Sequence, residues 1–264
     1  MGIRIEAGFT GLTYPMTNPR VCSSPVTGGT VTASSSATGF DAVNANDDLT
    51  WTFWQPVSNP ATWDLAFTTQ NISYCAIAAH NLGTQATGVS LQEWTGAAWV
   101  NIFNGQTPAN DDPLLFLFAQ RSTDRLRLSF TGPKPTIGVI WIGQVIEFPQ
   151  KCVWTGGVPF NEATESVFTD AISDGGHVLE RFATRKASSC QMTINNLSES
   201  WAASVLPVLK THMANRPIFM ADRPSAYPMS VTFGSQAEPL RAERTKNVLG
   251  AARTVQFNIV GNAP

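Results

Sequence analysis

The feature that most constrains this fold is a series of short strand-like segments that fills residues 28–148. Each segment is rich in β-branched and aromatic residues, and Gly, Pro, Asn or Ser residues separate it from the next. Eight such segments with no helical periodicity between them predict a β-sandwich of the jelly-roll kind. The segments are residues 49–54, 62–67, 73–79, 88–94, 99–103, 114–119, 125–130 and 136–145.

Two of these segments also predict how much of each strand is covered. Residues 125–130 alternate between polar and apolar side chains, which is typical of a strand with one wet and one buried face. Residues 136–145 are nearly all apolar, which predicts a central strand that is covered on both faces.

The pattern changes after Pro149, and residues 150–264 predict a smaller α+β module in the order β-β-α-β-β-β. The chain therefore divides into an extended N-terminal arm (1–27), a jelly-roll domain (28–149) and an α+β domain (150–264). The predicted strands of the last domain are residues 176–185, 188–195, 217–222, 228–234 and 254–260.

The helix of this module is predicted between Ser198 and Ala214. Ser198 suits the N-cap, and apolar residues from Trp201 to Met213 recur at four-residue spacing on one face. Pro207 interrupts this pattern, so we expect either a bend there or a second helix capped by Ser204.

Composition excludes several function classes. Charged residues make up 14% of the chain and the net charge is −2, with no run of Lys or Arg, which argues against a nucleic-acid partner. The sequence has no uninterrupted apolar stretch of about 18 residues, the length needed to span a membrane, so membrane insertion is not predicted. The N-terminus lacks the apolar segment of a secretory signal, so we expect folding in the cytoplasm. Four dispersed cysteines (Cys22, Cys75, Cys152 and Cys190) are expected to be reduced.

The order of features in the first half resembles the discoidin family and related carbohydrate-binding modules. An Asn/Asp-rich turn precedes Trp51, a Trp-Asp-Leu strand follows at Trp63, a tryptophan hairpin spans residues 94–99, and an Arg-Leu-Arg strand begins at Arg125. The resemblance implies a jelly-roll that binds a ligand.

Residues 76–83 and the layout of residues 150–264 resemble tail and baseplate proteins of tailed bacteriophages. In this layout, a β pair leads to a helix that contains Trp201, and a strand ends at Val260. The resemblance implies a non-enzymatic structural component of a phage tail tip or baseplate. Such a protein would form a homo-oligomer, contact other virion tail proteins, and be located in the virion tail after assembly in the host cytoplasm.

Catalytic chemistry is not predicted from the sequence. The three histidines, His80, His177 and His212, stand in no known catalytic motif, and no nucleophile elbow or phosphate-binding glycine loop is present. His80 precedes turn residues and is interpreted as a hydrogen-bonded residue that stabilises that turn. We therefore predict no catalytic residues, and no cofactor apart from the calcium alternative below.

An oxygen-rich turn holds Asn44, Asn46, Asp47 and Asp48. Calcium takes six to eight oxygen ligands, so this turn is a candidate structural calcium site. The alternative is a turn whose Asx side chains bond their own backbone, and the sequence favours it.

Tryptophans supply the candidate carbohydrate-binding residues. Trp94 and Trp99 flank a short turn and Trp54 begins a loop, so these three could stack against sugar rings. The alternative for Trp94 and Trp99 is a place in the core or in an interface, and Trp51, Trp63 and Trp141 are expected in the core. Two functions remain: the phage-tail component, and a carbohydrate-binding module that recognises a host surface glycan.

Overall fold

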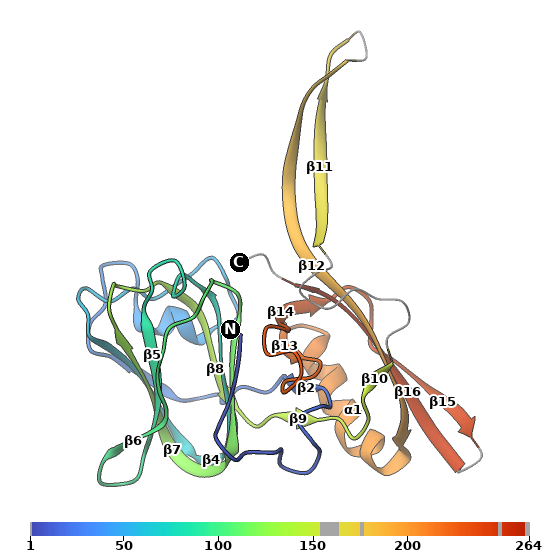
Figure 1. Ribbon diagram of the computed structural model, residues 1–264, viewed down its shortest axis with the longest axis horizontal. Helices are drawn as coiled ribbons and strands as arrows, with labels where there is room; N and C mark the ends of the chain where they lie inside the picture. The colour runs from blue at the N-terminus through green and yellow to red at the C-terminus, as the bar shows by residue number, and fades with distance from the viewer. Residues whose placement is uncertain (1, 154–163, 175–176, 248–249, 262–264) are drawn as a thin grey trace.

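In a computed structural model, residues 2–153, 164–174, 177–247 and 250–261 are described (Figure 1). The described chain is mainly β, with two sheets and the single α-helix α1 (Glu199–Met213). No helix within these ranges is long and apolar enough to cross a membrane.

The first half forms a two-layered sandwich from one strongly bent sheet. Its order is β3-β4-β7-β5-β6, with β1 beside β7 and β8 beside β4. The strands are β1 (Ile3–Ile5), β3 (Thr30–Ala33), β4 (Ala61–His80), β5 (Gly88–Trp94), β6 (Trp99–Gln106), β7 (Leu114–Thr131) and β8 (Ile137–Gly143).

The long strands β4 and β7 belong to both layers. Residues 61–66 pair with residues 125–130 in an outer layer that also holds β3, β5 and β6. Residues 74–77 pair with residues 114–117 in an inner layer that also holds β1 and β8. The register shifts between the two halves, as bulges at sheet bends do. Each pair of segments predicted for these strands is therefore one bent strand.

A hydrophobic core fills the space between the two layers. Trp63 and Leu65 of the outer layer and Cys75 and Ile77 of the inner layer belong to the same buried cluster. The predicted strand at residues 49–54 is wrong, because only Trp54 makes a ladder contact there, an isolated bridge to Ile137. A short 3-10 helix, η1 (Ala42–Asn46), precedes this loop.

The second sheet has the path β10-β12-β16-β14-β13-β2-β9, with β15 beside β16. It combines three short strands from the first 153 residues with the later strands. Its members are β2 (Arg20–Cys22), β9 (Ile146–Glu147), β10 (Cys152–Val153), β12 (Val178–Ser198), β13 (Ile218–Ala221), β14 (Val231–Gln236), β15 (Arg241–Asn247) and β16 (Gly250–Gly261).

The helix α1 begins where the sequence predicts. The Ser198 side chain accepts a hydrogen bond from the Trp201 amide at 3.3 Å, which caps the helix. The helix runs through Pro207 as one element, so the predicted alternative of a second helix is wrong. Its buried residues pack on the second sheet and form a core with Phe257 and Ile259.

A third core joins the two halves. The ring of Trp141, on β8, lies edge-on to Phe219 (5.4 Å) and Phe233 (5.7 Å) on the second sheet. Tyr74 and Leu115 of the inner layer belong to the same cluster. The inner layer is thus covered on both faces, which confirms the burial predicted for residues 136–145. The predicted central position is wrong, because β8 pairs with β4 alone among the described strands.

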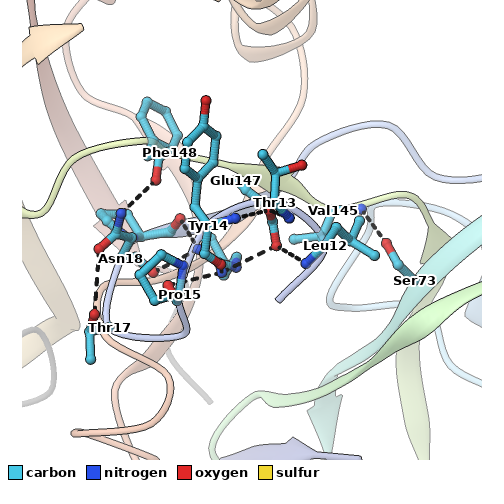
Figure 2. Close-up of polar contacts among 12 residues, drawn as sticks. Leu12, Thr13, Tyr14, Pro15, Thr17, Asn18, Ser73, Val145, Glu147 and Phe148 are labelled. Atoms are coloured by element: carbon cyan, nitrogen blue, oxygen red, sulfur yellow. Dashed lines mark hydrogen bonds and ion pairs between the residues drawn. The ribbon is translucent and has the colours of Figure 1, made fainter. Parts of the chain in front are cut away.

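The N-terminal segment and the linker strand β9 are held together by a buried ion pair (Figure 2). Arg20 Nη2 and Glu147 Oε1 lie 3.2 Å apart, and the two side chains are 0% and 6% exposed. The Glu147 carboxylate also accepts hydrogen bonds from the amides of Leu12, Thr13 and Tyr14 at 2.7–2.9 Å. Because β1 belongs to the first sheet and β2 to the second, the N-terminal segment connects the two halves.

A long hairpin extends away from the second half (Figure 1). It consists of β11 (Thr164–Ile172) and the first part of β12, which pair from Thr164↔Ser188 to Ile172↔Val178. Among the described residues, β11 pairs with no strand other than β12.

The expected reduced state is confirmed for two of the cysteines. Cys22 and Cys75 are free and buried, and burial raises the pKa of both thiols well above the ordinary value. Cys152 is buried beside Met192. The side chain of Cys190 lies outside the described residues.

Candidate functional site

Among the described residues, no other element packs a hydrophobic core against one of the two faces of the sandwich's outer layer. Side chains alternate along strands, so the residues on this face come from neighbouring positions of four strands. The inner layer lies against the second half, so this face points away from it, with β5 and β6 on the far side of the sandwich (Figure 1). We call it the tryptophan face; its residues are Asp64, Gln92, Trp94, Trp99, Asn101, Arg125 and Arg127.

Trp94 and Trp99 are directly opposite each other at the end of the β5–β6 hairpin. Their ring centroids are 5.3 Å apart with an interplanar angle of 57°. A tight turn fixes the hairpin, because the Thr95 amide donates to the Ala98 carbonyl at 3.0 Å and Gly96 has a φ of 90°. Both tryptophans are partly exposed and lie outside the core clusters, so their predicted alternative as core residues is wrong.

One arginine on this face is fully paired. Arg127 donates two hydrogen bonds to the Asp64 carboxylate, both at 2.7 Å, and these bonds raise the pKa of Arg127. Its guanidinium carbon lies 4.1 Å from the centroid of the Trp99 ring. The bidentate pair therefore fixes a planar cation beside the exposed indole.

Amide side chains extend the polar surface next to the indoles. The Gln92 side-chain amide donates to the Asn101 oxygen at 2.7 Å, and the Asn101 amide donates to the Asn104 oxygen at 2.7 Å. Donors and acceptors that lie beside two partly exposed aromatic rings can bind hydroxyl groups of a ligand whose apolar side rests on the rings.

Two sequence predictions about tryptophans are corrected by the structure. Trp54, predicted to bind a sugar ring, is 0% exposed, packs against Phe130 and donates its indole N–H to the Ser35 carbonyl at 3.0 Å. Trp51, expected in the core, is 74% exposed. The reason is that residues 49–53 form a loop, so the alternation expected of a strand does not apply.

The oxygen-rich turn is engaged in protein contacts. Asp47 accepts from the Leu49 amide at 2.8 Å, which is the Asx turn that the sequence left as the alternative to calcium. Asp48 binds Arg216 of the second half through two hydrogen bonds at 2.6 and 2.8 Å. The Asn44 amide donates to the Phe53 carbonyl at 3.3 Å, and Asn46 belongs to η1.

The candidate carboxylates of this turn therefore point toward different partners. Within the described ranges, no group of three or more His, Cys, Asp or Glu side chains is arranged to hold a metal ion. The calcium site stays a prediction that the contacts of Asp47 and Asp48 do not favour.

His80 lies at the end of β4 and is 6% exposed. Its Nδ1 accepts a hydrogen bond from the Leu82 amide at 3.3 Å, in agreement with a turn-stabilising role. Burial lowers the pKa of His80 to about 4, so the ring is neutral at ordinary pH and remote from the tryptophan face.

The sequence carries a signal for the polar part of this face. Arg125 and Arg127 are on the wet side of an alternating strand, and Asp64 is next to Trp63 in another. Only the register Asp64↔Arg127↔Gln92 brings them to the tryptophan hairpin.

No family model and no curated protein sequence matches this chain. Among solved structures, a pectin-binding carbohydrate-binding module is similar at 20% identity and TM-score 0.39, over 46% of this chain and 91% of that chain.

Two further similar structures are carbohydrate-binding modules. The "CBM32 of AlyQ in complex with 4,5-unsaturated mannuronic acid" has 14% identity and TM-score 0.37, over 43% of this chain and 92% of that chain. The module "CpGH89CBM32-6 produced by Clostridium perfringens" has 18% identity and TM-score 0.39, over 44% and 93%. No ligand is inferred from likenesses this distant.

Proposed function

We propose that the tryptophan face of the jelly-roll binds carbohydrate chains and that the protein is a binding protein, not an enzyme. The observation that carries this proposal is the pair Trp94 and Trp99, two partly exposed indoles 5.3 Å apart on an uncovered sheet face. An indole can bury the apolar face of a pyranose ring while neighbouring side chains bind its hydroxyl groups.

The polar neighbours of this pair suit such a ligand. Arg127 is held by Asp64 and so presents its guanidinium in a fixed plane beside Trp99. Gln92 and Asn101 add amide groups on the same face. A face preorganised by its own hydrogen bonds loses little side-chain entropy when a ligand binds.

The proposal is tested by binding to a panel of immobilised oligosaccharides, with the single variants Trp94→Ala and Trp99→Ala. We expect the unaltered protein to bind at least one glycan and each variant to lose about fivefold or more in affinity, since stacking of a ligand ring on one aromatic side chain contributes about 1–3 kcal/mol. Thermal unfolding of each variant checks that the fold is intact.

Trp51→Ala is the matched control, because Trp51 is an exposed tryptophan on a different part of the domain. Binding that disappears with Trp51 and survives the loss of Trp94 and Trp99 would place the ligand on the loops and refute the proposed face. An unaltered protein that binds no glycan of the panel would refute carbohydrate binding itself.

A second function is favoured by the projecting hairpin β11–β12. An isolated two-stranded hairpin is only marginally stable in water, and β11 has no further strand beside it in the described chain. A partner at this hairpin would complete its pairing. We therefore propose as the alternative an assembly role, as a homo-oligomeric component of a phage tail tip or baseplate that contacts other virion tail proteins.

The assembly role is tested by shortening the hairpin. Residues 168–184 are replaced with Asn-Gly, which joins Val167 to its register partner Arg185 through a two-residue turn. We expect the unaltered protein to form an oligomer in analytical ultracentrifugation and the shortened one to sediment as a monomer. An unaltered protein that stays monomeric at every concentration would contradict self-assembly.

A further inference from the structure

The two arginines of the tryptophan face differ in their partners. Arg127 is neutralised by Asp64 through two hydrogen bonds. Arg125 lies two positions earlier on the same face of β7, and no carboxylate in the described chain forms an ion pair with it. Two arginines and one aspartate leave one positive charge on this face, and it belongs to Arg125.

The surroundings of Arg125 hold its side chain beside the aromatic pair. Its guanidinium carbon lies 5.7 Å from the centroid of the Trp94 ring, and both residues come one position beyond the last pair of the β5–β7 ladder, Glu93↔Leu126. Its Nε is buried and has no hydrogen-bond partner among the described atoms. The terminal N–H groups of the guanidinium, and not the inaccessible Nε, are therefore the donors that a ligand can reach.

Most of the other charged groups close to this position form ion pairs with one another, and Asp124 is the exception. Glu93, the residue before Trp94, pairs with Arg121 at 2.6 Å, and Arg121 also pairs with Glu6. Asp124 is the sequence neighbour of Arg125 and makes no ion pair with it in the described structure. Arg125 is therefore a cation without a counter-ion, beside rings suited to a sugar.

We propose that the tryptophan face selects carbohydrate chains that carry carboxylates, with Arg125 as the group that binds the carboxylate of a uronic acid residue stacked on Trp94. The inference rests on the proposed carbohydrate binding and adds the chemical class of the ligand. Guanidinium and carboxylate match in shape and form paired, charge-assisted hydrogen bonds. A neutral sugar offers hydroxyl acceptors but no charge, so it would leave the Arg125 cation without a counter-ion.

The test compares tetrasaccharides in matched pairs that differ only at C6. Each pair has a uronic acid form and its carboxyl-reduced neutral form, with backbones of galacturonate and galactose, glucuronate and glucose, and mannuronate and mannose. Isothermal titration calorimetry at low and at high salt measures each affinity. We expect at least one uronic acid chain to bind about tenfold or more tightly than its neutral counterpart, since a hydrogen bond to a charged group contributes at least that factor. Added salt should reduce this preference.

The variants assign the preference to one side chain. Arg125→Gln should bring the affinities for the acidic and the neutral chains to within about twofold of each other. Arg125→Lys keeps the positive charge but loses the paired N–H donors of the guanidinium, so it should retain part of the preference. Arg241→Gln, which removes an exposed arginine from β15, should leave the preference unchanged. Unfolding midpoints show whether each variant is folded.

Each outcome bears on one of the two proposals. Equal binding of the acidic and neutral chains by the unaltered protein would overturn the role of Arg125 and leave carbohydrate binding in place. A preference that survives Arg125→Gln would also overturn it. Binding of no chain in any pair would refute the carbohydrate proposal together with the inference that rests on it.

Discussion

The buried imidazole of His80 predicts a specific loss of stability in mild acid. His80 is 6% exposed, and its Nδ1 accepts from the Leu82 amide, so the neutral ring is the form that fits. Burial lowers its pKa from 6.5 to about 4, although the nearby Asp111 carboxylate raises it in part. Protonation in the folded state would place a charge where solvent cannot reach it.

The sign and the size follow from proton linkage. Below pH 6.5 the histidine of the unfolded chain binds a proton that the folded chain binds only near pH 4. The contribution of His80 to the free energy of unfolding is therefore complete above pH 6.5 and falls as the pH drops toward 4. One pKa unit corresponds to about 1.36 kcal/mol, so the shift from 6.5 to about 4 removes roughly 3 kcal/mol.

The assay is urea unfolding, followed by tryptophan fluorescence, at a series of pH values from 7 to 4 for the unaltered protein and for His80→Asn. Asparagine has a hydrogen-bond acceptor close to the position of Nδ1 and does not titrate. We expect the variant to be less stable at pH 7 and the difference to shrink by roughly 3 kcal/mol at pH 4, because the titration of His80 no longer acts on the variant.

His177→Asn, measured at the same pH values, is the matched control for the substitution, because His177 is exposed. Profiles of the unaltered protein and of His80→Asn that run parallel from pH 7 to pH 4 would refute the reasoning, since they would show that the buried ring binds its proton as readily as an exposed one.

Two further predictions concern the contacts that hold the halves and the helix. Glu147→Gln should lower the free energy of unfolding by about 3–5 kcal/mol, because it leaves the charge of Arg20 buried without its partner. Glu238→Gln, at an exposed ion pair, is the control. A similar small change in both variants would contradict the prediction. Ser198→Ala should cost about 1 kcal/mol, because it removes the cap on the Trp201 amide. Urea unfolding measures both, and a Ser198→Ala loss no larger than that of the exposed Ser235→Ala would argue against the cap.

The features that the sequence predicted correctly depend on local rules. The cap of α1 needs only Ser198 and the backbone three residues later, and both are adjacent in the chain. The burial of β8 on both faces follows from its continuous apolar side chains. Hydrophobic periodicity and helix capping depend only on residues that are close in the sequence, so they can be recognised without knowing which strands pair.

The errors around Trp51 and Trp54 arose where a contact elsewhere decides the conformation. Residues 49–54 alternate like a strand, but Asp47 accepts from the Leu49 amide and from the Thr52 hydroxyl, which holds the segment as a loop. The alternation of residues 49–54 therefore does not indicate which side chains are buried. Trp51 turns to solvent and Trp54 enters the core, the reverse of the pattern expected from the sequence.

The candidate site could be predicted only in part for the same reason. The hairpin of Trp94 and Trp99 is local and was found from its turn residues. Its polar partners are distant, since Arg127 binds Asp64 across 63 positions of the sequence and both meet the hairpin only through strand register. Without the register, the alternating arginines show a wet face but not which side chains share it.

The two proposed functions use separate surfaces, and this separation has a physical consequence. The tryptophan face lies on the side of the sandwich remote from the second half, and the hairpin β11–β12 extends from the second half itself (Figure 1). Recognition of a sugar by one exposed face is usually weak, because few contacts offset the loss of freedom on binding. An oligomer that displays several such faces would bind a surface with many sugars more tightly by about 10²- to 10⁴-fold without any new contact. Assembly through the hairpin would then strengthen binding through the tryptophans, and the shortened-hairpin protein should keep its affinity for a single oligosaccharide while losing most of its affinity for a glycan-coated surface.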